Sequence, residues 1–182
     1  VELTRGDIGT REFIEGENLT QRTTLLDQGH NLQAVVATIA RNYVTQIMQG
    51  QVHSDVHPGN FRVTANNGVA ILDRNLYLNL DNSDKMLITS LSSSSSPHDK
   101  AQNIGTYLAT QGHHNPALIG QVEQVLDAYR GTDGIAQSMK VMREGGVELP
   151  LRVTLMAKNI MALDNMSRKE GFSGVQEALF YQ

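Results

Sequence analysis

Residues 53–60 read His53-Ser54-Asp55-Val56-His57-Pro58-Gly59-Asn60, and this stretch decides how the fold of the 182-residue chain is predicted. A proline and a glycine side by side prevent a continuous helix, so a loop is expected here. Two short apolar segments follow, residues 61–64 and 69–72, and Asn67-Gly68 between them is a strong hairpin signal. Asp73 comes directly after the second segment. The sequence therefore predicts a polar loop, a small β-hairpin and a carboxylate at the exit of the hairpin.

A long amphipathic helix is predicted just before this loop, from about Asn31 to Gln49. Asn31 is suited to cap its start and Gly50 to end it. Further upstream, residues 11–14 (Arg-Glu-Phe-Ile) predict a short strand, which a turn over residues 15–18 would close. The apolar residues of the helix recur at the three-to-four spacing of one buried face: Leu32, Val35, Val36, Ile39, Tyr43 and Ile47.

Only helices are predicted after residue 82. Apolar residues at helical spacing and glycines between the segments set their limits. The expected helices cover about residues 83–91, 99–111, 115–130, 134–144, 149–166 and 173–181. The predicted fold class is therefore mainly α with a small β-hairpin.

The polar residues of the loop match the needs of phosphoryl transfer. This chemistry requires a carboxylate near the attacking hydroxyl, oxygen ligands for magnesium, and firm positioning. Protein kinases supply these groups as H-x-D-x-x-x-x-N, followed by a metal-binding aspartate after a hairpin. His53, Asp55 and Asn60 have this spacing, and Asp73 stands at the expected hairpin exit. The sequence thus predicts the catalytic-loop region of a kinase-like fold.

The loop also resembles one particular family. His53-x-Asp55-x-His57-Pro58-Gly59-Asn60 is similar to the H-x-D-x-H-P-G-N loop of the UbiB family of atypical protein-kinase-like proteins. Residues 12–16 resemble that family's hinge between lobes, and Leu149-Pro150 resembles part of its C-terminal region. The resemblance implies the C-terminal (large) lobe of a protein-kinase-like fold, with Asp55 as the catalytic aspartate and Asn60 and Asp73 as magnesium ligands.

The same resemblance implies the remaining site residues and the cofactors. Phe13 and Ile14 would lie beside the adenine of ATP, and His57 would take the place of a phosphate-contacting lysine. ATP and Mg2+ are the cofactors expected of the family. Its members are associated with ATP hydrolysis and with ubiquinone or isoprenoid lipid metabolism, which implies a small-molecule or lipid-linked substrate.

The chain departs from the family pattern in ways that leave catalysis open. Asp73-Arg74-Asn75 stands where Asp-Phe-Gly is expected, and the first lysine of the chain is Lys85. A kinase-like site needs an N-lobe lysine to hold the phosphates. We therefore expect residues 1–182 to form a single C-lobe, whose N-lobe belongs to a longer parent protein, and to bind ATP poorly alone. The rival interpretation is a degenerate kinase-like module that binds a partner and catalyses nothing.

Within this single C-lobe, three parts are expected. Residues 1–18 would be hinge-like, residues 51–80 would hold the catalytic loop and the metal-binding aspartate, and residues 81–182 would form a helical subdomain.

Two simpler interpretations of the loop stay open. His53, Asp55 and His57 alternate along the chain, so on an extended segment they could form a zinc or iron triad. Alternatively, His53 could only pack the loop by bonding to backbone carbonyls.

Composition sets the broad class. A net charge of −4 gives no reason to expect nucleic acid as a partner, and the chain contains no cysteine. No apolar run is long enough to cross a bilayer. We expect a cytoplasmic location, with membrane association left open.

Overall fold

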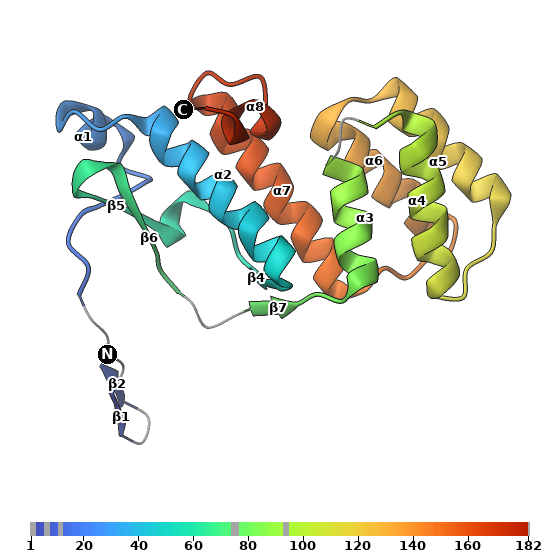
Figure 1. Cartoon of the computed structure of the whole chain (residues 1–182), viewed down its shortest axis with the longest axis horizontal. Coiled ribbons are helices and arrows are strands. Elements are labelled where there is room, and N and C mark those ends of the chain that lie inside the picture. The colour runs from blue at the N-terminus through green and yellow to red at the C-terminus, as the bar shows by residue number, and fades with distance from the viewer. Residues whose placement is uncertain (1–2, 6–7, 11–12, 74–76, 93–94, 182) are drawn as a thin grey trace.

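The computed structural model describes residues 3–5, 8–10, 13–73, 77–92 and 95–181. Over these residues the chain is mainly helical with small antiparallel sheets, which confirms the predicted fold class. Helices α2 (Leu32–Gln49) and α7 (Leu151–Lys169) pack against each other at the centre of the molecule (Figure 1). The hairpin lies on one side of this pair, and most of the later helices lie on the other (Figure 1).

Helix α2 forms where the sequence predicts it. The Asn31 side chain accepts a hydrogen bond from the backbone N–H of Ala34 at 3.1 Å, and Gly50 ends the helix with a φ of 79°. Glycine is the favoured residue at this position, because it adopts a positive φ without a steric penalty. The apolar face is buried, with Val35 at 0% exposure. Burial of this face fixes the orientation of the helix that precedes the catalytic-type loop.

The predicted hairpin is present as β5 (Phe61–Thr64) and β6 (Gly68–Ile71), which pair antiparallel. Its connection is longer than the two-residue turn that Asn67-Gly68 suggests. Residues 65–67 form a short 3-10 turn in which Asn66 and Asn67 both have positive φ angles, 57° and 60°. Asparagine tolerates this left-handed conformation better than other non-glycine residues.

The prediction of a strand at residues 11–14 is wrong for Phe13 and Ile14, which are irregular; residues 11 and 12 lie outside the described part. The strand β3 lies instead at Glu17–Asn18, inside the predicted turn, and pairs with β5. Gly16 explains the shift, because its φ is 135° and a Cβ there would lie 2.2 Å from the Val63 carbonyl oxygen. Only glycine lets the backbone approach β5 so closely.

Several short elements carry no clear sequence signal. They are β1 (Leu3–Arg5), β2 (Ile8–Thr10), α1 (Arg22–Asp27), β4 (Gln51–His53) and β7 (Tyr77–Asn79). Strand β4 pairs antiparallel with β7, so the loop starts from a two-stranded sheet. Elements this short have too few residues to show a hydrophobic period.

All six predicted later helices are present, with ends shifted by a few residues. They are α3 (Asn82–Ser92), α4 (Pro97–Thr110), α5 (Pro116–Ala128), α6 (Gly131–Glu144), α7 and α8 (Val175–Leu179). Helices α3 to α6 pack on one another in chain order, whereas α8 packs on α2 and α7. Within the described residues, no helix combines the length and the apolar character needed to cross a membrane.

An ion pair joins α7 to α3. The Nε of Arg152 donates to Oδ2 of Asp84, whose side chain is fully buried. The Nη2 of the same arginine lies 3.1 Å from Oδ2 of Asp81. A buried carboxylate of this kind needs a paired cation, so Arg152 fixes the start of α7.

Candidate functional site

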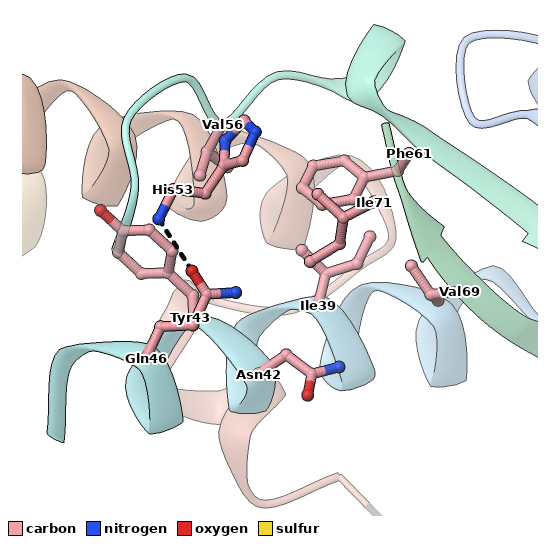
Figure 2. A pocket seen from close by; sticks show the side chains of 9 residues that line it. All are labelled: Ile39, Asn42, Tyr43, Gln46, His53, Val56, Phe61, Val69 and Ile71. Carbon is pink, nitrogen blue, oxygen red and sulfur yellow. Dashed lines mark hydrogen bonds between the residues drawn. The ribbon is translucent and has the colours of Figure 1, made fainter. Parts of the chain in front are cut away.

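His53 is a packing residue at the base of the loop. It is buried, and its backbone N–H donates to Oε1 of Gln46 at 2.8 Å (Figure 2). Its Nδ1 accepts the backbone N–H of Asp55 at 3.2 Å, and its Nε2 lies 2.9 Å from the carbonyl oxygen of Asp73. Because a carbonyl can only accept, Nε2 carries the proton. The structure therefore agrees with the interpretation of His53 as a loop-packing histidine bonded to a backbone carbonyl.

The metal-triad interpretation does not fit this geometry. Both ring nitrogens of His53 are engaged by backbone groups, which leaves neither lone pair for a metal. Among the described residues, no three histidine, aspartate or glutamate side chains are grouped to hold a metal ion. The pocket behind His53, bordered by Ile39, Phe61 and Ile71, has a volume of about 10 Å³ (Figure 2). This space is about that of one water molecule, so the region is packing rather than a ligand site.

Asn159 of α7 holds the loop through two hydrogen bonds to its backbone. Its Nδ2 donates to the carbonyl oxygen of His53 at 3.0 Å, and its Oδ1 accepts the backbone N–H of Val56 at 3.0 Å. The Asn159 side chain is fully buried. Sequence reasoning missed this residue, although an asparagine on the buried face of α7 between Met156 and Ile160 is a signal that could have found it. A buried side-chain amide is normally hydrogen-bonded, so an asparagine at such a position indicates a specific partner.

Asn60 and Asp73 are brought to the same end of the loop. The Nδ2 of buried Asn60 donates to the backbone oxygen of Asp55 at 2.9 Å, so its Oδ1 is the atom suited to a cation. The backbone N–H of Leu72 donates to the Asn60 carbonyl at 2.7 Å. That bond and the contact of His53 with the Asp73 carbonyl hold the hairpin exit beside the loop. Asp73 is exposed and has a φ of 50°.

Asp55 lies between two cationic or potentially cationic groups. Lys158 Nζ is 3.0 Å from Oδ1, and His57 Nε2 is 3.4 Å from Oδ2. The Asp55 side chain is 42% exposed. The hydrogen bond from Lys158 is the main cause that lowers the pKa of Asp55. Lys158 stands 103 residues further along the chain, so only the packing of α7 reveals it.

His57 is held in place by its own turn. Its Nδ1 accepts the backbone N–H of Gly59 at 3.1 Å and caps the 3-10 turn at residues 58–60. Nε2 is then the ring nitrogen directed at Asp55. A Cβ at Gly59 would lie 2.8 Å from the His57 ring, so glycine is needed to seat the imidazole.

Phe13 and Ile14 contact β5. The guanidinium of Arg62 lies 5.6 Å from the centre of the Phe13 ring, and Arg62 Nη1 donates to the Ile14 carbonyl at 3.0 Å. Phe13 is 79% exposed. Asn18 connects the end of this segment to the loop, because its Nδ2 donates to the Gly59 carbonyl at 2.8 Å. The structure thus brings Asp55, His57, Asn60 and Asp73 into one region, while Phe13 and Ile14 lie along β5.

A mainly helical fold with this loop, this hairpin and this aspartate defines an atypical kinase-like domain. The comparison with family models agrees: the ABC1 atypical kinase-like domain matches residues 1–104, which is more than half of the 182-residue chain. The chain therefore belongs to the ABC1 atypical kinase-like family. No curated protein and no solved structure matches it. Lys158 and Asn159 lie beyond the matched residues.

Proposed function

We propose that this chain supplies the catalytic loop and metal ligands of a magnesium-dependent, ATP-using phosphotransferase or ATPase of the UbiB type. One observation carries the proposal. His57 lies 3.4 Å from the Asp55 carboxylate, and the Asn60 side chain bonds to the Asp55 backbone. The contacts of His53 with the Asp73 carbonyl and of Leu72 with the Asn60 carbonyl hold the hairpin exit beside them. Kinase-like catalysis consists mainly of positioning and electrostatic stabilisation, which this rigid loop would provide.

Asp55 would orient the attacking hydroxyl or water. Its lowered pKa keeps it ionised at neutral pH, so it would accept a hydrogen bond from the nucleophile. A lowered pKa also makes a carboxylate a weaker base. Orientation is therefore the main role proposed for Asp55. Lys158 and His57, which flank the carboxylate, would help hold negatively charged phosphate oxygens near it.

Asn60 and Asp73 would hold Mg2+. Magnesium prefers carboxylate and carbonyl oxygens, and the Asn60 amide is oriented so that its oxygen is the ligand atom. In this proposal the exposed Asp73 carboxylate would be the second ligand. A bound magnesium ion would neutralise charge on the phosphates. In this proposal Phe13 and Ile14 lie beside the adenine, with Arg62 fixing their segment.

The rest of the nucleotide site would come from an N-lobe in a longer protein. No lysine precedes Lys85 in this chain, whereas the phosphates of kinase-bound ATP are held by an N-lobe lysine. Residues 1–182 would then be the C-lobe, with residues 1–18 as the hinge, 51–80 as the catalytic region and 81–182 as a helical subdomain. By resemblance, the substrate would be a small molecule or a lipid-linked compound of ubiquinone or isoprenoid metabolism, handled in the cytoplasm.

Thermal shift with Mg-ATP tests the proposal on two proteins, the 182-residue chain and the same chain extended upstream. We expect stabilisation in the extended protein, and a loss of that shift in its Asp73→Asn variant. Addition of ATP with a chelator in place of magnesium should also remove the shift. An extended protein that shows the same melting temperature with and without Mg-ATP would overturn the proposal.

The alternative is a kinase-like binding module without catalysis. The ion pair at 3.0 Å between Lys158 and Asp55 favours it, because it already occupies the carboxylate that a nucleophile would need. The departure at Arg74 and Asn75 from the family pattern points the same way, though both residues lie outside the described part. Unchanged melting of the extended protein with Mg-ATP would select this alternative.

A further inference from the structure

A second cavity lies among the later helices, away from the catalytic-type loop. Its volume is about 440 Å³, and all its lining residues fall between Leu91 and Glu177. Helices α4, α6, α7 and α8 contribute most of its wall. Ligand sites typically have volumes of about 300–1,000 Å³, so the space is large enough for a small organic molecule.

Buried aliphatic side chains line the apolar part of this cavity. Leu126, Ile135 and Ile160 are 9%, 3% and 5% exposed, and they come from α5, α6 and α7. Tyr129, at 47% exposure, adds an aromatic ring to the wall. This combination gives the cavity an apolar side against which a hydrocarbon chain or a ring can pack.

Two cations line the same cavity without a carboxylate partner. Lys100 of α4 and Arg130 before α6 are both lining residues. Among the described residues, neither has a carboxylate oxygen within ion-pair distance. Burial and then the nearby charge of Arg130 lower the pKa of Lys100, as expected for a cation whose charge is not compensated. An anion between the two side chains would relieve this repulsion.

The carboxylates of the cavity are already engaged elsewhere. Asp164 Oδ2 accepts from Arg168 Nε at 2.7 Å and from the Thr132 hydroxyl at 3.1 Å, while its Oδ1 accepts the Val175 N–H at 2.9 Å. Oε2 of Glu177 accepts a backbone N–H in the turn before α8. Arg168, which also lines the cavity, is paired through its Nε with Asp164, so Lys100 and Arg130 are the lining cations without a carboxylate partner in the described part of the chain.

The start of α6 strengthens the preference for an anion. Gly131 and Thr132, the first two residues of this 14-residue helix, line the cavity, and no side chain caps the helix N-terminus. Backbone N–H groups at such an end attract negative charge. This contribution adds to the two cations and would not define a site alone.

We propose that this cavity binds a small amphipathic anion. Its apolar body packs against Leu126, Ile135 and Ile160, and its carboxylate or phosphate lies between Lys100 and Arg130. The site is separate from the loop at residues 53–60, so it stands whether or not the chain takes part in phosphoryl transfer.

Isothermal titration of the 182-residue chain tests the proposal with three probes that share one alkyl chain: octanoate, octyl phosphate and 1-octanol. We expect at least one anion to bind at least tenfold more tightly than the neutral alcohol. Hydrogen bonds to charged groups contribute roughly tenfold or more each. The Lys100→Gln/Arg130→Gln double variant should therefore lose about tenfold or more in affinity for the anion, while octanol binding stays unchanged.

Lys140→Gln is the matched control, because Lys140 of α6 is exposed, does not line the cavity and pairs with Glu144 at 3.9 Å. It should bind the anion like the unchanged chain. Methyl NMR of Leu126, Ile135 and Ile160 locates the ligand, and their signals should shift on titration. Tight binding of octanoate alone identifies a carboxylate ligand, and tight binding of octyl phosphate alone a phosphate ligand. Equal affinity for all three probes, binding by none, equal loss in the Lys140 variant, or unshifted methyl signals would overturn the proposal.

Discussion

Replacement of the fully buried Asn159 by leucine should strongly destabilise the chain. Asn159 is fully buried and makes two hydrogen bonds to the loop backbone, at His53 and Val56. Leucine branches at Cγ as asparagine does and is somewhat larger, so the change removes both hydrogen bonds without opening a cavity. Two buried backbone groups then lose their partners.

The magnitude follows from those two groups. A buried donor or acceptor without a partner costs about 1–3 kcal/mol, so two of them cost about 2–6 kcal/mol in the free energy of unfolding. In a chain of this size, each kcal/mol lowers Tm by about 2–4 °C. The Asn159→Leu variant should therefore melt about 4–24 °C lower than the unchanged chain. The loop amides should also exchange with solvent faster, because their anchor on α7 is lost.

Differential scanning calorimetry and hydrogen exchange measure both effects. The neighbouring Lys158→Met variant is the matched control, since Lys158 is 59% exposed and makes only a surface ion pair. Such pairs contribute about 0–1 kcal/mol, so the control should lose at most a few degrees. If Asn159→Leu melts within 1 °C of the Lys158→Met control, then Asn159 does not hold the loop and the reasoning is wrong.

Three further predictions concern the loop and its supports. Lys158→Met should raise the pKa of Asp55 toward its ordinary value of 3.8, measured by carboxyl ¹³C NMR titration; an unchanged pKa would refute the role of the lysine. Because the folded-state pKa is lowered, this pair contributes stability above the ordinary pKa, and the contribution is lost as pH falls through the lowered value. Arg152→Met leaves the fully buried Asp84 carboxylate without its cation and should lower the free energy of unfolding by about 3 kcal/mol or more, measured by urea unfolding. The double variant with Asp84→Asn should recover part of this stability. Gly16→Ala places a Cβ 2.2 Å from a carbonyl oxygen of β5 at a φ of 135° and should lower the free energy of unfolding by at least about 1–3 kcal/mol; a wild-type Tm would contradict the close packing seen here.

Much of the fold could be predicted because its elements have strong local signals. Helix α2 has a full apolar face, a capping asparagine and a terminating glycine, so its limits agree with the prediction. The prediction fails over residues 13–18, where Gly16 and a contact with β5 decide the backbone path. A single long-range approach overrides weak local propensity in so short a segment. Strands β4 and β7 have three residues each, which is too few to show a hydrophobic period.

The candidate site also has one part that the sequence predicts and one part that only the structure shows. The spacing of His53, Asp55 and Asn60 with Asp73 was readable along the chain, because these residues occupy one loop and the hairpin after it. The structural role of His53 was only one of two options, and its two backbone contacts support that role.

The sequence by itself determined the helical fold class and the order of loop, hairpin and aspartate, because these depend on residues close together in the chain. Only the tertiary structure could bring Lys158 to Asp55, bury Asn159 against the loop, and enclose the cavity between α4 and α8. These contacts join residues separated by 103 or more positions, or by several helices. They arise from the way packed helices bury their apolar faces, which no local pattern encodes.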